Sequence, residues 1–123
     1  MGEQVSLAIE PAGLRARLVI DNPKGNVLTA GVVGMVRAKL ATLAELHSLR
    51  FLTVEAAGSD FSFGASIQEH APGQVERMLP DMHRMIHDLL AVPTPTAAVV
   101  QGRCLGGWFE LALACDFIFA ADD

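Results

Sequence analysis

The sequence predicts an α/β fold with a largely parallel sheet and flanking helices. Short runs rich in β-branched residues alternate along the chain with longer segments whose apolar residues recur at helical spacing. Strands that alternate with helices are typical of parallel sheets, because a parallel crossover needs a segment that returns the chain to the same end of the sheet. The chain of 123 residues can bury one modest core, so a single domain is expected.

The first part of the chain predicts a hairpin and a helix. Residues 5–9 and 14–20 alternate polar and apolar side chains on either side of the turn at 11–13, and this pattern is typical of two paired strands. Thr29 can cap a helix that runs to about His47, because apolar residues recur every three or four positions after it.

The rest of the chain continues the alternation of strands and helices. A helix is predicted over residues 74–91, with Pro80 either in the first turn of a second helix or as a kink in one helix, because proline removes an internal hydrogen bond. The remaining elements are predicted as strands at residues 51–57, 96–100 and 117–120 and as a helix at residues 107–115.

Residues 93–110 join a buried strand, a glycine turn and a helix start, with Glu110 on the first turn of that helix. Gly106 and Gly107 allow close approach of the backbone to a ligand. A helix that begins there directs unpaired N–H groups and the positive end of its dipole at the ligand, so an oxyanion could be held. A plain strand–turn–helix connection, with Glu110 as a first-turn carboxylate that suits the dipole, explains the segment equally well.

Residues 60–70 form a second small-residue loop after a strand. Gly64, Ala65 and Ser66 can supply a second exposed N–H group. Two such donors suit acyl chemistry on a thioester, where negative charge moves onto the carbonyl oxygen, and removing one donor typically costs about 10²–10³ in rate. Neither loop pairs Ser with His in a nucleophile elbow, so an enolate-stabilising site is favoured over a serine hydrolase.

In these segments the chain resembles the enoyl-CoA hydratase/isomerase, or crotonase, superfamily. Residues 22–28, Asn-Pro-Lys-Gly-Asn-Val-Leu, are similar to the family's early acyl-CoA loop. Residues 61–69 are similar to its first oxyanion segment and residues 101–116 to its second. The amino-acid sequences of residues 60–66 and 100–107 are similar to those of the cyclohexa-1,5-dienecarbonyl-CoA hydratases of anaerobic aromatic degradation.

The resemblance implies a crotonase-like ββα spiral and a reaction. In this reaction water adds to the activated double bond of an enoyl- or alicyclic dienoyl-CoA thioester, and the expected substrate is cyclohexa-1,5-dienecarbonyl-CoA. The catalytic residues implied are Glu110, which activates or orients the water, and the amides of Ala65 and Gly107, which stabilise the enolate. No separate cofactor is implied, because coenzyme A is part of the substrate. The substrate contacts implied are Lys24, Asn26, Val27, Gly64, Ala65, Ser66, Ile67 and Gly106.

Members of this family are much longer than the chain. The resemblance therefore implies that residues 1–123 are the N-terminal part of a single crotonase-fold domain, with the C-terminal half and its second acid absent. It also implies a homotrimer or hexamer for the full-length protein. Trp108 stands where the family usually has a small residue, so its ring either narrows the pocket or points away from it.

Two other functions remain open at this point. Another crotonase reaction, double-bond isomerisation or thioester hydrolysis, would reuse the same oxyanion hole with different carboxylates. A non-catalytic acyl-CoA-binding or assembly fragment is the alternative from a different class of protein.

Composition excludes some partners and indicates a compartment. The net charge is −5, and the nine Lys and Arg residues do not cluster, so no nucleic-acid partner is expected. No apolar run reaches the roughly 18 residues of a membrane helix, and the first ten residues do not resemble a signal peptide, so we expect no membrane partner and a cytoplasmic protein. Cys104 and Cys115 match neither a zinc spacing nor a disulfide framework and are expected to be buried packing residues.

Two further patterns favour structure over function. His83 and His87 lie four positions apart, but no third ligand accompanies them, so surface histidines and no metal are expected. Met78, Met82 and Met85 could shape an acyl pocket, although an apolar stripe on a helix usually faces the core.

Overall fold

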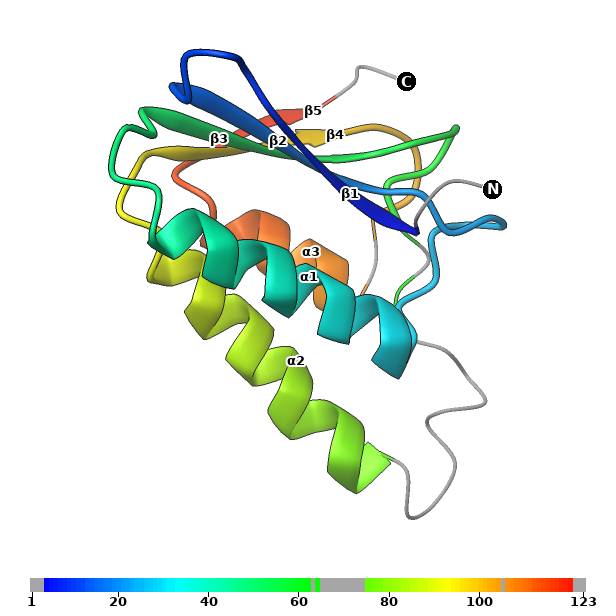
Figure 1. Ribbon diagram of the computed structural model, residues 1–123. Coiled ribbons are helices and arrows are strands. Elements are labelled where there is room, and N and C mark those ends of the chain that lie inside the picture. Colours follow the sequence, from blue (N-terminus) through cyan, green and yellow to red (C-terminus); the bar gives the residue numbers. More distant parts are fainter. Residues whose placement is uncertain (1–3, 63, 65–74, 105, 121–123) are drawn as a thin grey trace.

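The computed structural model describes residues 4–62, 64, 75–104 and 106–120. Figure 1 shows a twisted sheet with helices packed against one of its faces. In chain order the elements are β1 (Val5–Ile9), β2 (Arg15–Ile20), α1 (Ala30–Ala44), β3 (Phe51–Ala56), α2 (Val75–Leu90), β4 (Thr96–Val100), α3 (Gly106–Ala114) and β5 (Phe117–Ala120).

The sheet follows the chain order β1-β2-β3-β4-β5. β1 and β2 form the predicted antiparallel hairpin, whereas β2, β3, β4 and β5 pair in parallel. The prediction of a largely parallel sheet is therefore confirmed. Each predicted strand agrees with an observed strand to within one residue at either end.

Alternating side chains divide the sheet into a core face and an outer face. Leu18, Val54 and Ala98 are register partners across three strands, and all three are fully buried on the side of the helices. The neighbouring Arg17 is exposed, and its register partner Thr53 belongs to the same outer face. This period of two is expected for strands that pack helices on one side.

Helix α1 begins where its cap was predicted and ends before His47. The side chain of Thr29 accepts a hydrogen bond of 3.1 Å from the N–H of Val32, which satisfies one of the free amides of the first turn. At the other end the N–H groups of Glu45 and Leu46 bond to carbonyls three residues back. This tightened last turn ends the helix earlier than the apolar pattern alone suggested.

Helix α2 is one continuous helix that contains Pro80, so the alternative of a second helix beginning near Pro80 is wrong. Met82 and Met85 belong to the hydrophobic core, which confirms the packing interpretation for both, while the side chain of Met78 lies outside the described residues. His83 and His87 are exposed, as expected.

Helices α1 and α2 pack side by side beneath the sheet (Figure 1). Arg37 on α1 donates to Asp88 on α2 at 2.8 Å, at the border of their contact. Within the described part of the chain, no helix is both long and apolar enough to cross a bilayer.

Candidate active site

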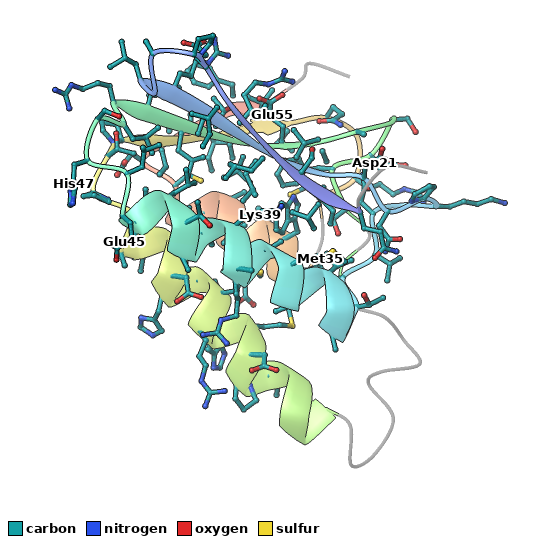
Figure 2. All side chains as sticks on the ribbon, in the orientation of Figure 1. Asp21, Met35, Lys39, Glu45, His47 and Glu55 are labelled. Carbon is teal, nitrogen blue, oxygen red and sulfur yellow. The ribbon has the colours of Figure 1, made fainter. Side chains whose placement is uncertain are left out.

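Three loops meet at the carboxyl ends of parallel strands. The first loop (residues 21–28) follows β2, the second loop (residues 57–64) follows β3, and the third loop (residues 101–104) follows β4. In Figure 1 they lie together at one end of the sheet, and Figure 2 marks Asp21 there. Ligands of open α/β sheets commonly bind outside the carboxyl ends of the strands. We call these three loops the loop junction.

The second and third loops continue the parallel pairing of their strands. The N–H of Phe61 donates to the carbonyl of Gln101 at 2.7 Å, and the N–H of Ser62 donates to the carbonyl of Arg103 at 2.9 Å. Ser62 and Cys104 form an isolated parallel bridge. The two segments that the sequence singled out for oxyanion donors are therefore neighbours in space.

Helix α3 starts close to this bridge. Gly106 is its first residue and Gly107 its second, so the N–H of Gly107 is among the first four amides of the helix, which have no intrahelical partner. Ala65, Ser66 and Ile67 lie outside the described residues.

Glu110 does not lie on the first turn of α3, and that prediction was wrong. The helix begins one residue earlier than predicted, at Gly106, so the carboxylate moves beyond the first turn, where the helix dipole acts less strongly on it. The Glu110 side chain is exposed, and within the described part of the chain it forms no hydrogen bond or ion pair.

Gly102 is a structural requirement of the loop junction that the sequence reasoning missed. Its φ of +59° lies in the left-handed region. A Cβ atom there would collide with the carbonyl oxygen of Ser59 and with the carboxylate of Asp60. That carboxylate also accepts a hydrogen bond of 2.8 Å from the N–H of Arg103. The close approach of the second and third loops thus requires glycine, and the Gln-Gly dipeptide was the only signal for it.

Trp108 points into the hydrophobic core. Its side chain is fully buried, and its ring centroid lies 5.9 Å from that of Phe61. The indole N–H finds no acceptor among the described residues. The two rings pack the start of α3 against the second loop. Trp108, which stands where the family usually has a small residue, therefore fills space in the core.

A pocket of about 420 Å³ opens between the first and second loops. Lys24 is exposed at this pocket, Val27 is partly buried, and Gly64 is buried beneath the loops. The residues that line the pocket are Asp21, Pro23, Lys24, Gly25, Asn26, Ala57, Gly58, Ser59 and Asp60.

Asn26 is only 4% exposed, and its side chain is engaged with the protein itself. Its Oδ1 accepts a hydrogen bond from the N–H of Asn22, and its Nδ2 donates to the carbonyls of Ala57 and Asp60, all at 2.8 Å. Asn26 also adopts a φ of +49°, which asparagine tolerates better than most residues. The structure therefore places this predicted substrate contact in a structural role at the pocket wall.

Neither cysteine is suited to act as a nucleophile at neutral pH. Burial raises the pKa of the Cys115 thiol to about 11, and burial also raises the pKa of Cys104, which is half-buried. The thiolate is the reactive form, so both side chains remain unreactive thiols. Cys115 is buried as predicted, whereas Cys104 only borders the core. No cluster of three metal-binding side chains occurs in the part of the chain that the structure describes.

The geometry defines a class of protein: an α/β domain in which three loops meet at the carboxyl ends of parallel strands. The sequence profile of the family described as "Enoyl-CoA hydratase/isomerase" matches residues 15–123. The chain belongs to the enoyl-CoA hydratase/isomerase family.

Curated relatives agree with this assignment. The chain is 36% identical over 115 residues to the cyclohexa-1,5-dienecarbonyl-CoA hydratase of Thauera aromatica, a match that covers 94% of this chain and 45% of the relative. It is 34% identical over 110 residues to the fatty acid oxidation complex subunit alpha of Vibrio vulnificus, with 85% of this chain and 16% of the relative covered.

Solved structures confirm the predicted crotonase-like fold. The enoyl-CoA hydratase of Bacillus anthracis superposes with a TM-score of 0.90 at 25% identity, covering 98% of this chain and 48% of that one. An enoyl-CoA hydratase/carnithine racemase from Magnetospirillum magneticum gives a TM-score of 0.87 at 24% identity, covering 98% and 47%. The chain thus spans about half the length of these proteins.

Proposed function

We propose that this chain carries the acyl-CoA site of a hydratase, a lyase that adds water to the activated double bond of an enoyl- or dienoyl-CoA thioester. The observation that carries the proposal is the pairing of the second and third loops through Phe61 and Ser62. This pairing brings the segment before Ala65 next to the start of α3, where the backbone amide of Gly107 has no partner within the helix.

In the proposed mechanism the thioester carbonyl accepts hydrogen bonds from the amides of Ala65 and Gly107. Glu110 accepts a proton from a water molecule as the water oxygen attacks the β-carbon. The electron pair of the double bond moves onto the thioester oxygen, and the two amides stabilise the resulting enolate. The Glu110 carboxyl then returns the proton to the α-carbon, which completes the addition of water and regenerates the carboxylate. The exposure of Glu110 leaves its carboxylate accessible to water, and its position beyond the first turn removes the explanation based on the helix dipole.

The proposed substrate class is a conjugated acyl-CoA, with cyclohexa-1,5-dienecarbonyl-CoA as the first candidate. The identity of 36% to a protein named for this reaction supports the choice. The pocket of about 420 Å³ beside Lys24 is large enough for part of the coenzyme A group. A homotrimeric or hexameric assembly and the lack of a separate cofactor remain predictions from the resemblance, and a cytoplasmic location remains a prediction from composition.

A second candidate function is non-catalytic binding of acyl-CoA or assembly with another polypeptide. Its specific support is the exposure of all four residues of β5. Isomerisation at the same oxyanion hole is a further alternative, supported by the relative named enoyl-CoA isomerase/hydratase fer4 from Mycosarcoma maydis, which is 40% identical over 76 residues, with 59% of this chain and 28% of the relative covered. Thioester hydrolysis at that hole remains an alternative from the resemblance alone.

The test measures binding and turnover separately. Trp108 is the single tryptophan and the chain has no tyrosine, so its fluorescence reports ligand binding near α3. Binding of crotonyl-CoA, cyclohexa-1,5-dienecarbonyl-CoA and free coenzyme A is titrated by fluorescence, and hydration of the two thioesters is followed by ultraviolet absorbance.

Glu110→Gln is compared with Glu45→Gln. Glu45 is equally exposed but caps the far end of α1, away from the loop junction (Figure 2). We expect hydration to fall by about 10²–10⁴ in Glu110→Gln, with binding and the control unchanged. Binding without hydration in the wild-type chain would favour the non-catalytic alternative, and a chain that binds no thioester would refute the acyl-CoA site.

A further inference from the structure

The loop junction contains a buried polar circuit that the proposed mechanism does not use. It begins at Asn26 in the first loop, whose side chain holds the carbonyls of Ala57 and Asp60 in the second loop. One amide group therefore anchors both ends of the turn that leads to Phe61. The Asn26 residue is only 4% exposed, so these part-buried hydrogen bonds are partly shielded from competition by water.

Ser62 closes the circuit from the other side. Its hydroxyl donates to the carbonyl of Asn26 at 2.7 Å and accepts from the N–H of Gly64 at 3.0 Å. The carbonyl of Gly64 in turn accepts from the N–H of Leu28 at 2.8 Å. Ser62 is fully buried. Its hydroxyl uses its one donor for the first loop and one acceptor position for the second loop.

The same residue connects the circuit to the third loop. Ser62 pairs with Cys104 and donates its backbone N–H to Arg103, while Gln101 donates its side-chain amide to the carbonyl of Ala56 at 2.7 Å. The side chain of Ser62 therefore faces the first loop and its backbone faces the third. Gly64, which the hydroxyl fixes, directly precedes Ala65, and Cys104 lies two residues before α3.

We propose that Asn26 and Ser62 are positioning residues that lock the three loops together and thereby set the spacing of the two oxyanion donors. The inference rests on the proposed function, because the donors are the amides of Ala65 and Gly107. Ser62 acts on them through the Gly64 amide on one side and the Cys104 bridge on the other.

A lock of this kind differs from ordinary packing in what it controls. An apolar side chain at either position would fill the space but leave the part-buried carbonyls of Ala57 and Asp60 or the buried carbonyl of Asn26 without these donors. The loops would then settle into other spacings. Transition-state stabilisation by an oxyanion hole depends on donor position, so it is more sensitive to such a change than the binding of the remote nucleotide.

The test compares Ser62→Ala and Asn26→Asp with Thr53→Ala. Asn26→Asp keeps the shape and the acceptor for Asn22 but removes the donors to the second loop, so it remains informative if Ser62→Ala fails to fold. Thr53→Ala removes a buried hydroxyl within the sheet, away from the loop junction, and serves as the matched control.

Two readouts separate the lock from the oxyanion site. Hydrogen exchange of the Gly64 and Leu28 amides reports the lock without any ligand. The ultraviolet spectrum of a bound conjugated acyl-CoA, cinnamoyl-CoA, reports polarisation of the thioester carbonyl, because donors at that oxygen shift the absorbance to longer wavelength. The affinity for free coenzyme A is measured alongside.

We expect both lock variants to exchange these amides roughly tenfold faster and to lose the red shift, because one lost hydrogen bond changes an opening equilibrium by about that factor. Affinity of Ser62→Ala for coenzyme A and all properties of Thr53→Ala at the junction should stay as in wild type. Retention of the red shift in folded Ser62→Ala and Asn26→Asp would overturn the proposal, as would unchanged exchange. A wild-type chain that binds cinnamoyl-CoA without a red shift would refute the proposed oxyanion hole. The exchange rates of the Gly64 and Leu28 amides would then be the test of whether Asn26 and Ser62 hold the loops together.

Discussion

The loop junction and strand β5 differ in how much of their surface the described residues bury and pair. Phe61 in the junction is fully buried, whereas Phe119 on β5 is 60% exposed. The junction pairs its buried amide and hydroxyl groups across three loops, but β5 is an edge strand, paired with β4 alone among the described residues, and all four of its residues are exposed. The geometry of the junction is thus encoded within this chain, while an exposed apolar edge indicates a surface that favours contact with other polypeptide.

Replacement of the two phenylalanines tests this difference most strongly. Phe61→Ala should lower the free energy of unfolding by about 3–5 kcal/mol, because it leaves a cavity beside Trp108. Phe119→Ala should lower it by less than about 1 kcal/mol, because that ring is already largely in water. Urea unfolding followed by circular dichroism measures both. Equal losses would show that β5 is covered in solution and would remove the contrast.

A pair of glycine substitutions sharpens the comparison at the backbone. Gly102→Ala forces a side chain into a left-handed position against Ser59 and Asp60, so we expect a loss of about 2–3 kcal/mol. Gly34→Ala places its methyl group in open space on α1 and should stabilise the chain by about 0.5–1 kcal/mol. Denaturation midpoints of the two variants should therefore move in opposite directions. An undisturbed midpoint for Gly102→Ala would contradict the close approach of the second and third loops.

Local patterns in the sequence predicted the sheet and helices well, because strand alternation and helical spacing depend on near neighbours. Thr29 is the clearest case, since a capping residue acts on an amide only three positions away. The start of α3 was missed by one residue because two consecutive glycines offer no side chain that marks a helix boundary. That single residue moved Glu110 off the first turn and changed the interpretation of its carboxylate.

The loop junction was less accessible to sequence reasoning. Asn26 was predicted as a substrate contact on a resemblance, and its buried role depends on partners more than 30 positions away. Ser62 stands between two phenylalanines in a loop, a pattern that does not distinguish a buried hydroxyl from an exposed one. The orientation of Trp108 likewise depends on its contact with Phe61, which only the folded chain brings about. The roles of Glu110, Ala65 and Gly107 in catalysis remain predictions.

The outer face of the sheet carries a polar counterpart to the apolar β5 edge. Arg17 on β2 donates from Nε and Nη2 to the two carboxylate oxygens of Glu55 on β3, each at 2.9 Å. Thr53 donates to the same carboxylate at 2.8 Å. Figure 2 shows Glu55 on the side of the sheet away from α1. The polar groups of Arg17, Thr53 and Glu55 are thus paired with one another on this part of the outer face, as the polar groups of the loop junction are.

This ion pair gives the smallest effect that we expect, and its pH dependence has a defined sign. The hydrogen bond from Arg17 lowers the pKa of Glu55 below its ordinary value of 4.5, against the opposing effect of burial and with a further contribution from Thr53. A carboxylate with a depressed pKa in the folded state stabilises the fold above its unfolded pKa and loses that contribution as the pH falls through the folded pKa.

Arg17 is half exposed, so solvent screening limits the loss in Glu55→Gln at pH 7 to about 0.2–1 kcal/mol. Urea midpoints of wild type and variant should differ at pH 7 and converge in acid below the ordinary value. Glu10→Gln, whose carboxylate lies 3.7 Å from Arg15 with both side chains half exposed, should cost less at pH 7. A difference for Glu55→Gln that persists in strong acid would show that the glutamate acts by packing, and the polar half of the outer face would then resemble β5 more than the junction.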